Sequence, residues 1–429
     1  MNKVMVSLLV SLAVILIAGT ALAGANIPIN DNASLNLGYR VQAQFINTDM
    51  DLDGDGKLDS YRYFKVRRGR LRLGAKVGDH MTAFLQTDAS NKDMQLIDAW
   101  VNFKVNPWLQ FIMGRNMAPA NRQNLTSSGA LMAIDRPGIA YKSLTWGTRA
   151  LHTFSNTTYE FSDSQGLGGG PDAVRDNGLT IFGSNALGSS GSSHLKYYVG
   201  IYNGIQADLN AGVVSPTDTG KDSKSQRITL RAQYNLWDAE SGYYNSSTYL
   251  GTKKTLGIGF SYDMQSEVAQ NRDLDTGVLD PNKPLADYAY MSADVFLEHP
   301  FSSGNALTVE GGWMSLDFDD AVGFLNTQGS GFYGQAGYFI ASGWQPWVEF
   351  ETFDSDFPAL TGEGPSYDGT VPGKYTTFRV GVTYYLEGQH ANIKLGYESF
   401  KSDTPLDENA SGAIEDTIST ITLGFYTTY

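Results

Sequence analysis

Apolar and polar side chains alternate residue by residue in many segments of this chain. In residues 33–45 leucine, tyrosine, valine and phenylalanine take the odd positions, whereas asparagine, arginine and glutamine take most even ones. Successive side chains of a β-strand point to opposite faces, so this period predicts strands with one apolar and one polar face. The pattern, with turn residues between segments, predicts strands at 33–45, 61–78, 81–88, 97–105, 109–113, 178–187, 194–203, 227–237, 255–266, 288–298, 307–318, 331–340, 346–353, 375–386, 393–400 and 418–429.

The connections between these segments alternate between short and long. Residues 78–79, 341–343 and 387–389 are short links, whereas 205–226 and 354–374 are long. Transmembrane β-barrels have this asymmetry, with tight turns at one rim and long loops at the other. The predicted fold is therefore an all-β, transmembrane antiparallel barrel. It has sixteen strands if 118–177 is one long loop, and eighteen if residues 139–161 add a hairpin.

The strand 61–78 carries an unusual number of cations on one face. That face holds Arg62, Arg68, Arg70, Arg72 and Lys76, and leucine, alanine and valine dominate the other. Lys65 and Arg67 break the alternation near the start of the strand, where a membrane edge tolerates cations. An arginine that faces lipid at mid-bilayer costs roughly 2–4 kcal/mol, so the basic face is expected to line the barrel interior.

Two interpretations of this basic face follow. Arg40 on the neighbouring strand extends it, and several cations on one wall of a narrow passage lower the barrier for anions. Alternatively, the arginines pair with interior carboxylates such as Asp88 and Asp98 and only stiffen the wall. Both place the cations in the lumen of a pore.

The first residues have the pattern of a secretory signal peptide. Lys3 precedes an apolar run at 4–18, and Ala21-Leu22-Ala23 provides a small-x-small cleavage site. The alternative, an N-terminal membrane anchor, needs about 20 apolar residues, which the run does not reach. We expect a signal at 1–23 and a single outer-membrane barrel domain at 24–429. The final strand ends in the aromatic Tyr429, as barrels of the Gram-negative outer membrane commonly do.

Composition restricts the kinds of partner that the chain can bind. The net charge of −14 argues against nucleic acid, and cysteine is absent, so disulfides do not hold this exported chain together. The expected partners are outer-membrane lipid and lipopolysaccharide together with small solutes.

The segment 49–59 contains a pattern typical of calcium-binding loops. Asp51, Asp53 and Asp55 alternate ahead of Gly56, and Asp59 stands at the ninth position. Arg62 takes the twelfth position, where a bidentate glutamate is required, and the loop joins strands rather than helices. The segment is either a weak Ca²⁺ site in an outer loop or a solvated acidic hairpin tip; no other cofactor is expected.

Other functions have less support in the sequence. The five histidines are scattered and form no Ser/His/Asp or HExxH arrangement, so we expect no enzyme. The chain contains no CxxCH motif, so a barrel that sheathes an electron-transfer cytochrome would depend on its partner for haem. An outer-membrane enzyme and a structural or adhesive barrel are further alternatives.

Several segments resemble one known family. Residues 64–78 (FKVRRGRLRLGAKVG), 114–137 (GRNMAPANRQNLTSSGALMAIDRP), 175–183, 197–204, 249–263 and 378–398 are similar, in order, to the phosphate-selective porin O and P family. The resemblance implies a sixteen-stranded outer-membrane porin, a homotrimer, with its third loop folded into the lumen. In that loop region the charged candidates for the constriction are Arg115, Arg122, Asp135 and Arg136.

The sequence therefore predicts a passive outer-membrane porin for small hydrophilic solutes, either a general one or one that mildly prefers anions. The loop at 118–177 would limit solute size, and the basic face would set the charge preference. A tight lysine cluster is missing from the loop region, so the resemblance supports a porin more firmly than selectivity for phosphate.

Overall fold

The computed structural model describes residues 25–50, 59–89, 94–137, 174–188, 191–204, 207–208, 213–214, 225–270, 284–317, 319, 329–355, 374–402 and 417–429. Within them, no helix is long and apolar enough to cross a membrane. Residues 1–24 lie outside this part of the chain, so the signal peptide and its cleavage site stay predictions.

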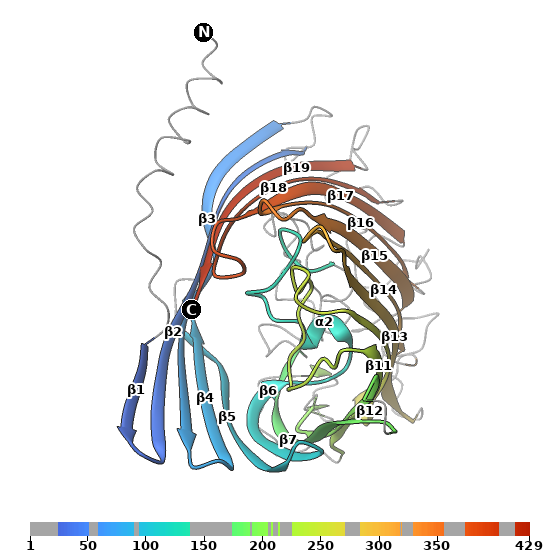
Figure 1. The fold of residues 1–429 in the computed structure, drawn as a ribbon. Coiled ribbons are helices and arrows are strands. Elements are labelled where there is room, and N and C mark those ends of the chain that lie inside the picture. The colour runs from blue at the N-terminus through green and yellow to red at the C-terminus, as the bar shows by residue number, and fades with distance from the viewer. Residues whose placement is uncertain are drawn as a thin grey trace.

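Antiparallel strands make up nearly all of the described structure (Figure 1). Their bounds are β1 (Ala25–Asn30), β2 (Ala33–Met50), β3 (Asp59–Val77), β4 (Met81–Asp88), β5 (Gln95–Asn106), β6 (Leu109–Met117), β7 (Arg175–Ala186), β8 (Ser193–Tyr202), β9 (Ala207–Asp208), β10 (Val213–Val214), β11 (Arg227–Trp237), β12 (Thr255–Gln270), β13 (Leu285–Pro300), β14 (Ala306–Asp317), β15 (Gly329–Phe339), β16 (Trp344–Ser355), β17 (Lys374–Tyr385), β18 (Ala391–Ser402) and β19 (Thr417–Thr428). A short helix, α2 (Arg122–Leu125), lies inside the ring of strands.

Sixteen of the described strands close into a barrel. Each strand from β2 to β8 pairs with the next, β8 pairs with β11, and the ladder continues to β19, which pairs with β2. β6 pairs directly with β7, so the connection between them adds no hairpin to the wall. The prediction of sixteen strands is confirmed, and the alternative of eighteen is wrong. Closure satisfies the backbone groups of every wall strand, as a sheet in lipid requires.

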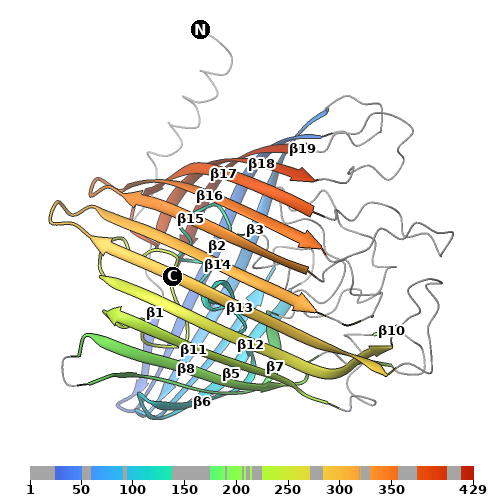
Figure 2. The same ribbon diagram turned by 90° about the vertical axis from the view of Figure 1, so that its right-hand side faces the viewer.

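The two rims of the barrel differ. Short turns at 78–80, 107–108, 301–305 and 340–343 lie at one rim, which we call the short-turn rim (Figure 2). The connections β2–β3, β6–β7 and β12–β13 emerge at the opposite, long-loop rim. In outer-membrane barrels the tight turns face the periplasm.

Side-chain burial follows the alternation that the sequence shows. In β11, Arg227, Thr229 and Arg231 are buried toward the interior, whereas Leu230 and Tyr234 are exposed on the outside. The same exposure of outward apolar residues recurs around the barrel, for example at Leu395 and Phe425. The outer surface is thus apolar and the inner one polar, which is the arrangement expected of a barrel in a bilayer.

A β-bulge at Arg67 interrupts the alternation of β3. Gln42 pairs with Arg68 and Ala43 pairs with Val66, so Arg67 is the extra residue. In the first half of β3 the inward side chains therefore have odd residue numbers, and in the second half they have even ones. Arg68 points into the barrel, whereas Phe64 is 85% exposed on the outside.

β1 lies beside β2 without belonging to the closed ring. It pairs with Ala33–Leu37 of β2, and the same edge of β2 pairs with β19 from Arg40 onward. The two strands share one edge and meet at Gly38. A Cβ atom at Gly38 would come within 2.2 Å of the Tyr429 carbonyl oxygen, which explains why a glycine stands there.

Two chain segments lie inside the barrel. Residues 118–137, the described part of the loop between β6 and β7 (loop three), are almost all buried. Residues 238–254, which connect β11 to β12 at the short-turn rim, also place buried side chains there, among them Glu240, Asn245 and Thr248. Both are visible within the ring of strands in Figure 1.

Candidate permeation pathway

A cluster of arginines lines the inner face of β2 and β3. Arg40 lies directly opposite Arg70 in the register of the two strands, and Arg68 and Arg72 occupy the adjacent inward positions of β3. Like charges in directly opposed positions destabilise a sheet unless other groups compensate them. The partners of each arginine therefore decide whether the cluster can act on a solute.

Carboxylates compensate only part of this charge. Arg70 Nε lies 2.6 Å from Asp88 Oδ2, and Arg68 Nη2 lies 2.8 Å from Asp135 Oδ1. The bulge directs Arg67 inward as well, and its Nε lies 2.7 Å from the other oxygen of Asp135. Asp135 thus holds two arginines and ties loop three to β3.

Arg40 has no side-chain carboxylate partner within salt-bridge distance among the described residues. It donates hydrogen bonds to the hydroxyl groups of Ser128 and Thr428, the latter at 3.2 Å. Hydroxyl oxygens satisfy N–H groups but do not neutralise the positive charge. Arg72 donates to the backbone oxygen of Tyr429, the last residue of the chain, at 3.4 Å and lies over the Phe84 ring, 5.5 Å from its centroid.

Lys76 marks the short-turn end of the same face. Its side chain is 54% exposed, and its Nζ lies 3.1 Å from Asp79 in the adjoining turn. Exposed pairs of this kind contribute little energy, so Lys76 keeps most of its attraction for anions in solution.

Arg62 does not belong to the cluster, contrary to the prediction. It precedes the bulge, so its parity is reversed and it lies on the outward face, where its Nε donates to Asn47 Oδ1 at 2.7 Å. Phe45 and Phe64 pack together on that face in a tilted arrangement, with ring centroids 5.1 Å apart. The irregularity at Lys65 and Arg67 was the sequence signal of this change; we interpreted it as the edge of a membrane.

Arg115 is also displaced from its expected place. In register it pairs with Ala99 of β5 and Asn177 of β7, both on the outward side of the wall. It therefore lies outside loop three and apart from the inner arginine cluster.

The remaining charged residues predicted in loop three hold the loop itself. Arg122 donates two hydrogen bonds to Glu240, at 2.8 and 2.7 Å, and both side chains are fully buried. Arg136 donates to the carbonyl oxygens of Gln123 and Thr126, at 2.9 and 2.5 Å. These arginines fix the fold of the segment and are not presented to a solute.

The wall opposite the arginine cluster contains matched or acidic groups. Arg227 binds Asp263, Arg231 binds Asp294, and Arg379 contacts three carboxylates, those of Glu349, Glu351 and Glu398. All three arginines are buried. Cationic charge in excess of carboxylates is therefore concentrated on the β2–β3 side.

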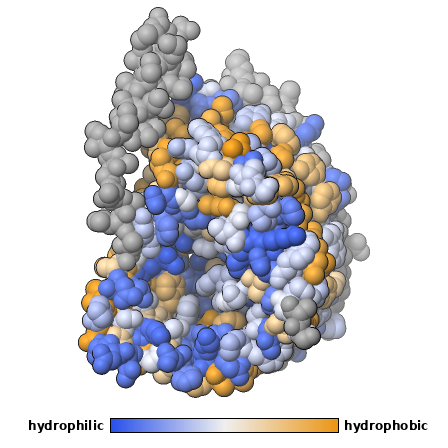
Figure 3. All heavy atoms as spheres, viewed as in Figure 1, coloured by the Kyte–Doolittle hydropathy of each residue, from blue (hydrophilic) through white to orange (hydrophobic). Residues whose placement is uncertain are grey.

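An open space lies beside that side of the barrel. Figure 3 shows a hollow lined by hydrophilic residues, and Figure 1, in the same view, places it between the β2–β5 wall and α2. Ser127 and Ser128 of loop three contact Arg40 and Arg70 of this wall. No pattern in the sequence singles out these two serines.

The acidic segment 49–59, either a weak calcium site or a solvated hairpin tip, lies mostly outside the described residues. Asp51, Asp53 and Asp55 lie outside the described residues, and only the backbone of Asp59 is described, at the start of β3. In the part of the chain that the structure does describe, no group of three or more potential metal ligands occurs.

Known proteins match this chain in sequence and in fold. The family model described as phosphate-selective porin O and P matches residues 35–200. No curated protein sequence matches. Among solved structures, an anion-selective porin from Comamonas acidovorans superposes with a TM-score of 0.51 at 10% identity, covering 92% of this chain and 100% of that one.

Two further solved structures have the same fold. The outer-membrane channel DcaP of Acinetobacter baumannii has a TM-score of 0.50 at 13% identity, with 95% of this chain and 100% of that one covered. In-vitro folded OmpT, an outer-membrane protein of Vibrio cholerae, has a TM-score of 0.50 at 12% identity, with 94% and 100% covered. The chain thus shares the closed barrel fold of these outer-membrane proteins, with sixteen wall strands among its described residues, and its residues 35–200 are similar to the phosphate-selective porin O and P family.

Proposed function

We propose that this porin is a passive diffusion channel that prefers small hydrophilic anions, and that the arginine cluster of β2 and β3 sets the preference. One observation carries the proposal. Among the described inner-wall residues of these strands and their contacts, five guanidinium groups meet two side-chain carboxylates; these residues are Arg40, Arg67, Arg68, Arg70 and Arg72 with Asp88 and Asp135.

The physical basis is the field of uncompensated charge in a confined passage. Walls of low dielectric constant focus the field of this cluster, including that of the buried Arg40, into the adjoining passage. An anion there exchanges part of its hydration for attraction to the guanidinium groups, whereas a cation is repelled. The hollow beside this wall supplies the passage (Figure 3).

The segments inside the barrel support an off-centre route for the solute. Residues 118–137 hydrogen bond to the wall far from β3: the Asn121 side-chain amide donates to the Tyr290 hydroxyl of β13, and the Ser292 hydroxyl of β13 donates to the Ala120 carbonyl, at 2.9 Å each. Inward side chains of β11–β18 are buried beneath such contacts. Solutes would then pass beside β2–β5, where they meet the arginines.

Reversal potentials in a salt gradient across a planar bilayer test this proposal. The variant Arg40→Gln/Arg70→Gln/Arg72→Gln should move the reversal potential toward that of a cation-preferring pore. One unit charge 4 Å away changes the energy of an ion by about 1 kcal/mol even in bulk water, so the anion-to-cation permeability ratio should fall at least about fivefold.

Arg62→Gln is the matched control, because it removes the same charge from the outward face of the same strand. Its reversal potential should equal that of the unmodified protein. If the triple variant leaves selectivity unchanged, the arginines only brace the wall; if the unmodified protein prefers cations, the anion preference itself is wrong.

The alternatives have less support. A sheath around a cytochrome needs a free lumen, whereas this one is partly filled by the chain's own segments. The fold and the family are those of a channel, and we propose no catalytic activity. The homotrimer, lipopolysaccharide contacts and the weak calcium site stay predictions, which native mass spectrometry in detergent, with and without Ca²⁺, would test.

A further inference from the structure

The connection between β11 and β12 is unusual for its position in the barrel. It lies at the short-turn rim, where the other described connections are tight, yet it spans residues 238–254. Instead of projecting into solvent, it places Glu240, Asn245, Ser247 and Thr248 in the interior, each no more than 2% exposed. A solvated turn needs no such burial, so the segment has another role.

Backbone hydrogen bonds join this segment to loop three. The Asn245 amide donates to the Leu125 carbonyl at 2.8 Å, and the Ser127 amide donates to the Asn245 carbonyl at 3.0 Å. The Ser247 amide donates to the Ala130 carbonyl, also at 3.0 Å. Thr126 and Asn245 form a parallel β-bridge at the centre of this contact. Chain from the long-loop rim and chain from the short-turn rim thus meet inside the barrel.

Glu240 connects this contact to the barrel wall. One of its carboxylate oxygens accepts from Arg122 of α2 and from the Tyr249 hydroxyl, at 2.7 and 2.6 Å. The other accepts from Arg122 and from Gln233 of β11, both at 2.8 Å. The Arg122 guanidinium also lies over the Phe296 ring of β13, 3.8 Å from its centroid. Bidentate pairs of this kind fix orientation as well as position.

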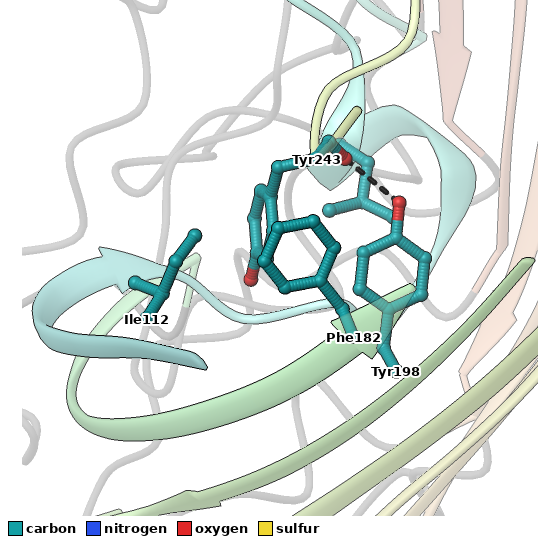
Figure 4. Packing of buried hydrophobic residues seen from close by; sticks show 5 residues of the cluster. Ile112, Phe182, Tyr198 and Tyr243 are labelled. Carbon is teal, nitrogen blue, oxygen red and sulfur yellow. Dashed lines mark hydrogen bonds between the residues drawn. The ribbon is translucent and has the colours of Figure 1, made fainter. Parts of the chain in front are cut away.

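A second set of contacts anchors the segment to β6–β8. Tyr243 packs among Ile112, Phe182 and Tyr198, and its carbonyl accepts from the Tyr198 hydroxyl at 2.7 Å (Figure 4). The Tyr243 hydroxyl donates to the Met117 carbonyl at 2.5 Å, where loop three begins. Lys196 Nζ donates to the Glu240 carbonyl at 2.9 Å. The segment is therefore fixed on both sides.

We propose that residues 238–254 are the positioning element of the constriction, with Glu240 as the positioning residue that holds loop three through Arg122. The inference rests on the proposed function only in that the constriction conducts. Under it, the width of the passage is set from both rims: Asp135 holds loop three to β3, and residues 238–254 hold the part of loop three around α2.

Single-channel recording of Glu240→Ala tests the proposal. Removing one partner of a buried ion pair shifts the equilibrium by at least about 100-fold toward arrangements that do not need the pair. Displaced arrangements of loop three should then appear as fluctuating conductance levels and frequent voltage-induced closure. Glu387→Gln, in another turn of the same rim, is the matched control and should conduct like the unmodified protein.

A disulfide provides a second readout that needs no conductance. The chain contains no cysteine, so Thr126→Cys/Asn245→Cys introduces a single pair, at bridged positions. Oxidation should cross-link it completely in the folded protein without changing the conductance. In the Glu240→Ala background the cross-link should restore a single stable level.

Two outcomes would overturn the inference: steady, unaltered current through Glu240→Ala, or failure of the cysteine pair to cross-link in a folded barrel. A folded protein that cross-links but passes no current would instead refute the proposed function and leave the positioning role intact.

Discussion

At the scale of single residues, charge alone does not reveal the role of an arginine in this barrel. Arg62 and Arg72 lie on the same strand, but the first contacts Asn47 on the outside and the second faces the interior. Arg122 carries the same guanidinium group, but its charge is paired with the Glu240 carboxylate. The sequence predicted Arg40, Arg68, Arg70 and Arg72 on the inner face from alternation alone, whereas Glu240 lies in a non-alternating stretch that offers no period to read.

The Arg122–Glu240 pair should give the protein a specific pH dependence. Burial by itself raises the pKa of Glu240, but the charge and hydrogen bonds of Arg122, the Tyr249 hydroxyl and the nearby Lys196 outweigh it and lower the pKa from 4.5 to about 2. The pKa of Arg122, which also faces Glu310, is raised, so this partner stays charged. A carboxyl group with a depressed pKa stabilises the fold fully above its ordinary pKa, and this contribution is lost as the pH falls through the folded value.

We therefore expect the unmodified protein to be more stable than Glu240→Gln by about 3 kcal/mol at pH 6, with the difference shrinking between pH 4.5 and 2. Thermal unfolding in detergent at a series of pH values measures it. A difference that persists at pH 2, or is missing at pH 6, would contradict the assignment of the pair.

At the scale of elements, the bulge in β3 decides which side chains enter the lumen. Alternation predicted the strand and the inner face of its second half, because residues 68–76 keep one parity. It could not reveal the parity of the first half, since one extra residue reverses every side chain before it. Lys65 and Arg67 carried that information, but the same break in pattern also fits a strand that leaves the membrane.

Deleting Arg67 should therefore be tolerated, whereas deleting Leu71 from the regular half of the strand should not. Without Arg67, Arg68 still pairs with Gln42 and Val66 with Ala43, so every other side chain of β3 keeps its face and the ladder becomes regular. Deleting Leu71 instead turns Arg68 and Arg70 toward lipid, or else the pairing with β2 slips. Little of that variant should acquire the folded form that migrates differently from heated protein on a denaturing gel; equal folding of the two deletion variants would argue against Arg67 as the extra residue.

At the scale of the whole molecule, the chain has three environments: an apolar exterior, a packed polar side and an open basic side. The first could be predicted, because lipid imposes the period of two on every strand. The division of the interior could not, because it arises from loop three and residues 238–254, whose contacts join positions more than a hundred residues apart. In the sequence, only the length of the connection 238–254, at a rim where the other connections are short, indicates that it has a special role.

The apolar exterior predicts a graded cost for charge. Leu395 lies on the outward face near the middle of β18, and Ser399 lies on the same face closer to the long-loop rim. Leu395→Arg should destabilise the barrel by about 2–4 kcal/mol, and Ser399→Arg by about 1 kcal/mol or less, because the cost falls toward the interface. Urea unfolding in lipid vesicles measures both; equal costs would place this face away from lipid.

The shared edge of β2 also restricts how the ring can close. β1 occupies the edge at residues 33–37, so β19 finds partners only from position 39 onward. A slip of β19 toward the short-turn rim would collide with β1, and a slip by one residue in either direction would expose its polar face to lipid. The hairpin of β1 and β2 thus limits the register of closure: β1 occupies part of the β2 edge and thereby determines where the pairing of β19 with β2 ends.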